Sequence, residues 1–144
     1  MRQPAVFVVA LTDADEVVLV DLYRYTTGER SIEVPAGGVD AADGTDTLAA
    51  AKRELREETG LAASRWRHLG RTQALNGVVD APEHAFLATG LSLLGGDERA
   101  EEGIDQVLRV PFGEVLAMIA DGRITDSETI TAVALAGIEL GRFR

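Results

Sequence analysis

The segment at residues 47–59, TLAAAKRELREET, constrains the fold most, because its residue types predict a helix with two different faces. At about 100° per residue, Glu54, Glu57 and Glu58 fall within an arc of roughly 100° and share one face. A separate apolar stripe recurs at spacings of three and four residues and can pack against a sheet. The stripe consists of Leu48, Ala51 and Leu55. We therefore expect one buried side and one strongly negative side.

The carboxylates on this helix face allow two interpretations. Like charges three and four residues apart repel at a cost of a few tenths of a kcal/mol per pair, and a hard divalent cation would reverse that cost. Carboxylate oxygens suit Mg²⁺ or Mn²⁺ rather than zinc, and Mg²⁺ commonly binds carboxylates together with substrate phosphates. Alternatively, the face is solvated, with Arg53 paired to Glu57 one turn later.

The composition is that of a globular protein and limits the classes of partner. We expect a single domain at residues 1–144, long enough to bury a core. The net charge of −10 argues against a nucleic acid or an anionic membrane as partner. The absence of cysteine excludes disulfides, thiolate catalysis and cysteine-bound zinc. No run has the features of a signal peptide or a membrane span, so we expect a cytoplasmic protein.

Helices are expected in three places along the chain. The helix at 47–59 would be capped by Asp46 or Thr47 and ended by Gly60. A second helix is expected at 112–120 from its amphipathic spacing. A third is expected at 129–140, where a capping residue stands in front.

The remaining apolar segments predict strands. Runs at 5–11 and 16–23, joined by polar turn residues, are typical of a β-hairpin with buried strands. The polar segment 94–102 is expected to be a mobile acidic loop. Further strands are expected at 31–34, 66–75, 84–91 and 105–110. Because few strands are joined by helical crossovers, this order favours an α+β sandwich in which helices cover a mixed sheet.

The end of the first helix carries a specific motif. Residues 53–61, RELREETGL, match the pattern REUxEExGU position for position, where U is aliphatic. This pattern is half of the Nudix box, so the chain resembles the Nudix hydrolase family. The resemblance implies a Nudix-type α/β/α sandwich with a mixed sheet flanked by helices, and a bound Mg²⁺, with Mn²⁺ as the other candidate ion.

The front half of the box departs from the family pattern. Thr45 stands where the family has a glutamate that often pairs with the box arginine, here Arg53. We expect Asp43 or Asp46 to substitute for that glutamate. Aligning the box glycine with Gly37 also requires two extra residues in the following loop.

Segments outside the box point to one subgroup. Residues 22–25, 33–37 and 122–130 resemble segments of ADP-ribose and nucleotide-sugar pyrophosphatases, and the similarity extends over nearly the whole chain. The resemblance implies hydrolysis of the pyrophosphate of ADP-ribose or a related nucleoside diphosphate sugar. The products would be a nucleoside monophosphate and a sugar phosphate.

The box match also implies roles for individual residues. Glu54 and Glu58 would be the main metal ligands, and Glu57 a ligand or a carboxylate that positions water. The carbonyl of Ala36 would be a further ligand, and Arg53 would hold the glutamates in place.

Members of this subgroup often take their general base from a mobile loop in the C-terminal third. Here the acidic segment offers Glu101 and Glu102, with Glu98 as a weaker candidate. We favour Glu102, because a base on a closing loop activates water only when substrate is bound. The alternative is a solvated run of charges.

Substrate contacts are expected just before the box. Arg24 and Glu33 resemble positions that contact the substrate across a dimer, and Gly37-Gly38 permits a close backbone approach. Related enzymes usually exchange strands through a longer N-terminal region, whereas little precedes Ala5 here. We therefore expect a homodimer with a different interface.

Two other functions remain open at this stage. One is hydrolysis of a nucleoside triphosphate, including oxidised nucleotides, by the same mechanism. The other is a Nudix domain that binds a nucleotide sugar without cleaving it. The segment 33–37 argues against a triphosphate substrate, and the presence of Glu54, Glu57 and Glu58 argues against a domain that only binds. We therefore favour an enzyme that acts on a small nucleotide-sugar substrate.

Overall fold

The computed structural model describes residues 4–143 of the chain. The outermost residues of the predicted domain, 1–3 and 144, lie outside the described part. Within residues 4–143, no helix is both long and apolar enough to cross a membrane. In chain order, the elements are β1 (Ala5–Ala10), β2 (Glu16–Arg24), β3 (Glu29–Glu33), β4 (Ala36–Gly38), α1 (Thr47–Thr59), β5 (Leu61–Gln73), β6 (Pro82–Leu93), α2 (Arg99–Glu102), β7 (Ile104–Pro111), α3 (Phe112–Ala120) and α4 (Ser127–Glu139).

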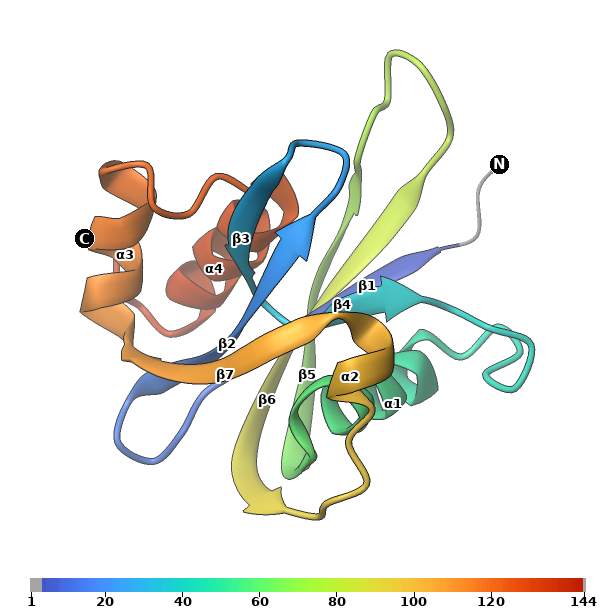
Figure 1. The fold of residues 1–144 in the computed structure, drawn as a ribbon, viewed down its shortest axis with the longest axis horizontal. Helices are drawn as coiled ribbons and strands as arrows, with labels where there is room; N and C mark the ends of the chain where they lie inside the picture. The colour runs from blue at the N-terminus through green and yellow to red at the C-terminus, as the bar shows by residue number, and fades with distance from the viewer. Residues whose placement is uncertain (1–3, 144) are drawn as a thin grey trace.

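The strands form two sheets (Figure 1). A four-stranded mixed sheet has the order β4-β1-β6-β5, in which β1 runs parallel to β6 and antiparallel to β4. A three-stranded antiparallel sheet has the order β3-β2-β7. The arrangement confirms the expected α+β class with a mixed sheet.

Helices cover both faces of the four-stranded sheet. Alternate residues of β1 point to opposite sides, since side chains in a strand alternate. Val8 packs with Ala51 and Leu55 of α1 in one core, whereas Val9 packs with Val133 of α4 in another. Burial on both faces explains why the predicted strand is a continuous apolar run rather than an alternating one.

The predicted β-hairpin at 5–11 and 16–23 is wrong in its pairing, although both strands form. Both edges of β1 are occupied, by β4 and β6, so β2 pairs instead with β3 and β7. Only an isolated bridge between Leu11 and Val17 joins the two segments. The tight turn preceding β2 includes Asp15 at φ 63, and it directs the chain into the second sheet.

The first helix agrees with the prediction at both ends. The Asp46 carboxylate accepts a hydrogen bond from the Ala49 N–H at 3.1 Å, and Gly60 ends the helix at φ 75. Strand β5 begins at Leu61 rather than at residue 66, because it continues directly from that glycine.

The segment 94–102 is not wholly a loop, since it contains the single-turn helix α2. Its polar residues do not pack in a core, but backbone hydrogen bonds attach it to the end of α1. The Gly95 N–H donates to the Gly60 carbonyl at 2.9 Å, and the Glu98 N–H donates to the Glu57 carbonyl at 2.5 Å. These bonds place α2 beside α1.

Candidate metal and substrate site

The glutamates of α1 lie beside the short strand β4. Glu54 and Glu58 are only 6% and 7% exposed, so the interpretation of a fully solvated face fails for them. The helix passes so close to β4 that a Cβ built on Gly37 would overlap the Glu54 carboxylate. Glycine at position 37 therefore leaves room for the Glu54 carboxylate.

A cluster of three carboxylates, called here the carboxylate cluster, forms where α1 meets α2. It consists of Glu54, Glu57 and Glu102, whose nearest ligand oxygens all lie within 4.8 Å of one another. Helix α2 thus brings one of the predicted general bases to two of the predicted metal ligands. Glu101 is exposed on the same turn, and among the described residues the cluster does not include it.

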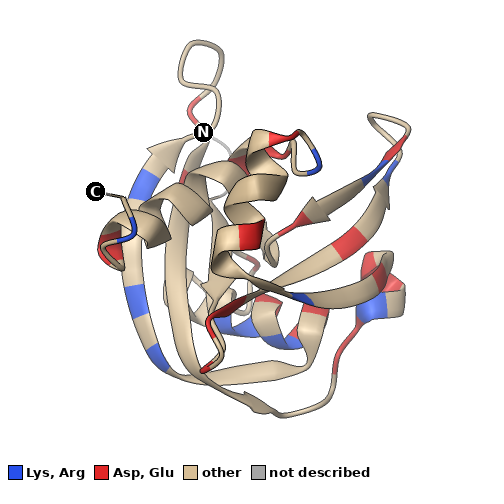
Figure 2. Cartoon of the chain, turned by 90° about the vertical axis from the view of Figure 1, so that its left-hand side faces the viewer, with Lys and Arg blue, Asp and Glu red and all other residues tan. Residues whose placement is uncertain are grey.

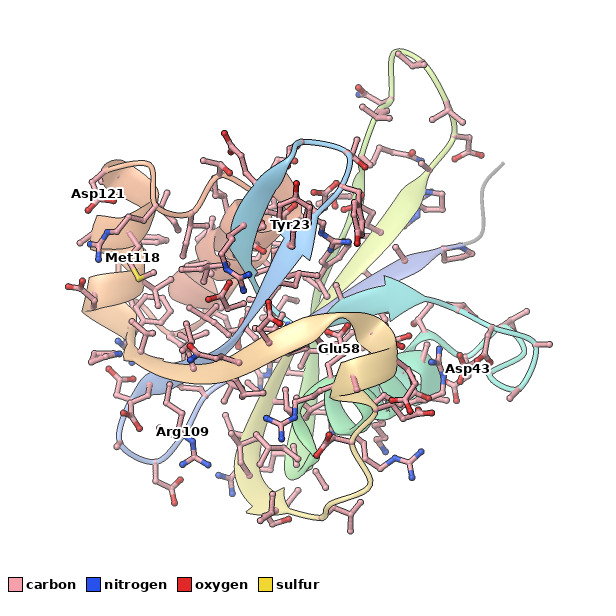
Figure 3. The ribbon with its side chains drawn as sticks, in the orientation of Figure 1. Tyr23, Asp43, Glu58, Arg109, Met118 and Asp121 are labelled. Atoms are coloured by element: carbon pink, nitrogen blue, oxygen red, sulfur yellow. The ribbon has the colours of Figure 1, made fainter. Side chains whose placement is uncertain are left out.

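Glu58 (Figure 3) is held next to the cluster by the backbone of β4. The N–H of Ala36 donates a hydrogen bond to Glu58 Oε1 at 3.0 Å. This contact fixes one carboxylate oxygen and joins two residues that the box match implies as ligands.

The electrostatics of these glutamates favour either a proton or a cation. Burial raises the pKa of Glu54 to about 7, and the nearby carboxylates of Glu102 and Glu57 add to the shift. Burial raises the pKa of Glu58 to about 8, again with contributions from neighbouring carboxylates. A divalent cation would therefore compensate charges that the protein leaves in excess.

Arg53 connects the carboxylates to one another and to the loop before α1. Its Nη1 donates to Glu54 at 2.8 Å and to Glu57 at 3.0 Å, while Nη2 donates to the Gly38 carbonyl at 2.9 Å. The predicted pair between Arg53 and Glu57 is therefore present, within a larger network. Gly38 takes part through its backbone.

Asp43 substitutes for the missing box glutamate (Figure 3). Arg53 donates to the Asp43 carboxylate through Nη2 at 2.8 Å and through Nε at 3.2 Å. These hydrogen bonds lower the pKa of Asp43 below its usual value. The expectation that Asp43 or Asp46 would replace the glutamate is confirmed for Asp43, whereas Asp46 caps α1. Thr45 is exposed.

A groove with a volume of about 380 Å³ runs from Glu58 and Glu102 to the start of α4. The predicted residues Arg24, Glu33 and Gly37 line it together with Glu58 and Glu102. The full lining is Ala5, Phe7, Leu22, Arg24, Glu33, Ala36, Gly37, Glu58, Glu102, Asp126 and Glu128.

Arg24 and Glu33 form a two-point ion pair in the wall of the groove. Arg24 Nε donates to Glu33 Oε2 at 2.9 Å, and Nη2 donates to Oε1 at 2.6 Å. The Glu33 side chain is buried, while that of Arg24 remains half exposed. The pair leaves part of the guanidinium accessible to a ligand.

Two acidic residues of the groove were not among the predicted site residues. Asp126 and Glu128 come from the start of α4, close to Arg24 and Glu33. The sequence could have indicated them, because both belong to segment 122–130, which resembles a motif of the subgroup. Its place beside the segment 33–37 depends on the tertiary fold.

The donor set of the carboxylate cluster fits a hard divalent cation. It contains only oxygen donors, and nearby Glu58 adds a further carboxylate. Figure 2 shows that acidic residues are spread over many elements, so acidic charge alone does not mark the site. The site is marked by proximity and burial.

Comparison with known proteins defines the family. The NUDIX domain family matches residues 1–133, and the chain therefore belongs to the Nudix family. An ADP-ribose pyrophosphatase of Mycobacterium tuberculosis is 38% identical over 135 residues, which cover 93% of this chain and 62% of that protein. This chain thus spans less than two thirds of that relative.

Two further matches agree with the family. A methanol dehydrogenase activator of Bacillus methanolicus is 35% identical, over 92% of this chain and 72% of that protein. The crystal structure of an ADP compounds hydrolase superposes with a TM-score of 0.86 at 22% identity, covering all of this chain and 76% of the other. That structure supports the fold.

Proposed function

We propose that this protein hydrolyses the pyrophosphate of ADP-ribose or a related nucleoside diphosphate sugar, giving a nucleoside monophosphate and a sugar phosphate. The observation that carries the proposal is the carboxylate cluster, whose member Glu102 also lines the groove that contains the Arg24–Glu33 pair. The similarity to an ADP-ribose pyrophosphatase supports this substrate class.

The proposed cofactor is Mg²⁺, with Mn²⁺ as a substitute. Glu54, Glu57 and Glu58 would hold it together with the Ala36 carbonyl, and Glu102 is close enough to add a ligand. When bound, such an ion neutralises phosphate charge and lowers the pKa of a coordinated water. The role of Arg53 is to keep Glu54 and Glu57 in register while the protein is free of metal.

The proton of the attacking water has a proposed acceptor in Glu102. Its carboxylate is next to Glu54 and Glu57 but is carried by α2, an exposed single turn. Glu57, which is less buried than the other two glutamates of α1, is the second candidate.

Binding of the substrate is assigned to the other half of the groove. The exposed part of the Arg24 guanidinium can donate to phosphate or base oxygens, while Glu33 fixes its orientation. The backbone at Gly37 and Gly38 presents no side chain that would block a pyrophosphate.

We also propose a homodimer. Tyr25 is 92% exposed and forms an edge-to-face pair with Tyr23, beside Arg24. Exposed aromatic residues at the end of β2 suit contact with a second subunit. Light scattering over a range of concentrations tests this, and a monomer at every concentration would contradict it.

The activity is tested by Mg²⁺-dependent turnover of ADP-ribose beside UDP-glucose, diadenosine polyphosphates and an oxidised dGTP. We expect AMP and ribose 5-phosphate from ADP-ribose. Pyrophosphate released from the oxidised dGTP in preference would support a triphosphate hydrolase instead. A melting temperature raised by ADP-ribose without any turnover would support a binding domain.

A further inference from the structure

The segment that joins β3 to β4 supplies several groups of the site. Glu33 at its start pairs with Arg24, and the Ala36 N–H at its end donates to Glu58. Val34 between them is 1% exposed, and its N–H lies beyond the β2–β3 ladder, whose last pair is Val20 with Glu33. This buried donor therefore needs an acceptor from outside the sheet.

The acceptor comes from the first turn of α4. The Val34 N–H donates to Thr129 Oγ1 at 3.1 Å, across 95 residues of sequence. Thr129 is fully buried, and its hydroxyl donates to Asp126 Oδ2 at 2.6 Å. Because an ionised carboxylate only accepts, the hydroxyl proton is directed to Asp126 and an oxygen lone pair remains for Val34.

This arrangement connects two walls of the groove. On one side, Asp126 lines the groove from α4, and on the other side Ala36 contacts Glu58 of α1. The Pro35 carbonyl accepts a hydrogen bond from the Val8 N–H at 2.9 Å, which fixes the middle of the segment to β1. The contact of Thr129 with Val34 is the corresponding attachment to α4.

We propose that Thr129 is a positioning residue, whose hydroxyl holds the segment 33–36 in the place that aligns Ala36 and Glu58 for the reaction. The inference rests on the proposed function and adds to it a residue that contacts neither metal nor substrate. Without the hydroxyl, the Val34 N–H would lack an acceptor in a dry site, and the segment would shift to reach water. Such a shift would move the Ala36 backbone relative to Glu58.

The test compares three variants of α4. Thr129→Val keeps the shape and removes the hydroxyl, Thr129→Ser keeps the hydroxyl, and Thr131→Val is a matched control whose side chain makes no hydrogen bond in the described structure. With ADP-ribose, we expect Thr129→Val to lower kcat by about tenfold or more while KM changes less than about threefold. Thr129→Ser should restore most of kcat, and Thr131→Val should leave it unchanged.

Two further measurements do not depend on turnover. Hydrogen exchange of the Val34 amide should be about tenfold faster in Thr129→Val and close to the wild-type rate in Thr129→Ser. Affinity for Mn²⁺ alone, followed by the electron paramagnetic resonance signal of the free ion, should fall only in Thr129→Val. If that variant is insoluble, Thr129→Ala replaces it in both measurements.

The proposal is overturned if Thr129→Val keeps wild-type kcat, or if Thr129→Ser is as impaired as Thr129→Val. Unchanged amide exchange and Mn²⁺ affinity in Thr129→Val would overturn it independently. Failure of the wild-type protein to cleave any of the substrates would refute the proposed function, while the exchange and Mn²⁺ measurements would still decide whether Thr129 holds the segment.

Discussion

The two ends of the site differ in the partners of their charged side chains. At the carboxylate cluster, Glu54 and Glu102 face other carboxylates, and burial raises the pKa of Glu54 to about 7. At the α4 end, Arg24 pairs with Glu33 and Asp126 accepts hydrogen bonds from Thr129, although burial and the neighbouring Glu128 raise the pKa of Asp126. A divalent cation would compensate the carboxylates at the first end, whereas the side chains at the second end are held by contacts with one another.

This difference determines how substitutions should act. At the cluster, removing a carboxylate should remove metal binding and the chemical step together. At the α4 end, removing a group that lines the groove should weaken or misplace the substrate, because the reacting atoms lie elsewhere. Thr129 does not line the groove and should act instead through its contact with the segment 33–36. The predictions below test that division in order of decreasing effect.

The largest effect is expected for Glu58→Gln. The change keeps the volume but removes a charge held beside the cluster by the Ala36 N–H. We expect kcat for ADP-ribose to fall by about a thousandfold, because charge neutralisation by the ion is lost. Asp13→Asn, in the exposed turn before β2, removes the same charge and should have no effect. Equal activity of the two variants would break the comparison.

The next effect separates neighbouring glutamates of α2. Both side chains are exposed, but Glu102 belongs to the carboxylate cluster and Glu101 does not. Loss of a general base typically costs about 10²- to 10⁴-fold, so Glu102→Gln should lower kcat by about a hundredfold or more. Glu101→Gln should lower it less than about twofold. A reversed order of the two in steady-state kinetics would reassign the base.

A smaller effect is expected in the loop before α1. Asp43→Asn weakens the support of Arg53, and loss of such supporting contacts commonly costs about 10- to 100-fold in metal affinity or activity. Asp46→Ala instead removes the helix cap, at a cost of about 1 kcal/mol, and should lower the melting temperature by about 2–4 °C with kcat retained. Titration with Mg²⁺ and thermal unfolding distinguish the two.

At the α4 end, Arg24→Gln should change binding more than chemistry. Loss of a charged hydrogen bond to substrate predicts a KM about tenfold higher with kcat within about threefold. Arg109→Gln is the matched control, because Arg109 is exposed on β7 and outside the groove (Figure 3). A large fall in kcat with unchanged KM would place Arg24 with the catalytic groups instead.

The two ends also differ in how far they could be predicted from sequence. The face of α1, its cap at Asp46 and its end at Gly60 follow from neighbouring residues, because helix periodicity and capping act over a few residues. The resemblance to the Nudix box, with Thr45 in place of a glutamate, limited the expected partner of Arg53 to Asp43 or Asp46. Which of the two pairs with Arg53 required the structure.

Several contacts between distant segments were not predicted. The partners of β1 and β2 were assigned wrongly, since an apolar run does not reveal which strand lies on each edge. The contact of Thr129 with Val34 joins two segments that were recognised only separately. Backbone hydrogen bonds attach the segment of α2 to the end of α1. Its polar sequence alone does not predict these bonds.

The smallest expected effect concerns stability of the metal-free protein. The pKa of Glu54 rises to about 7 and that of Glu58 to about 8, from a usual value of 4.5. Between pH 4.5 and about 8, the folded state therefore binds more protons than the unfolded state, so its stability falls as pH rises. With EDTA present, the melting temperature should fall by a few degrees between pH 6 and pH 8.5.

Repulsion among the acidic residues, at a net charge of −10, would give a slope of the same sign, and a variant removes this ambiguity. Glu58→Gln should flatten the dependence of melting temperature on pH, whereas Asp13→Asn should not. Added Mg²⁺ should stabilise the wild type more at pH 8.5 than at pH 6, because protons compete for the same oxygens. Parallel slopes in the wild type, Glu58→Gln and Asp13→Asn would mean that the pKa of Glu58 is not raised in the metal-free protein. The contrast between the two ends would then rest on geometry alone.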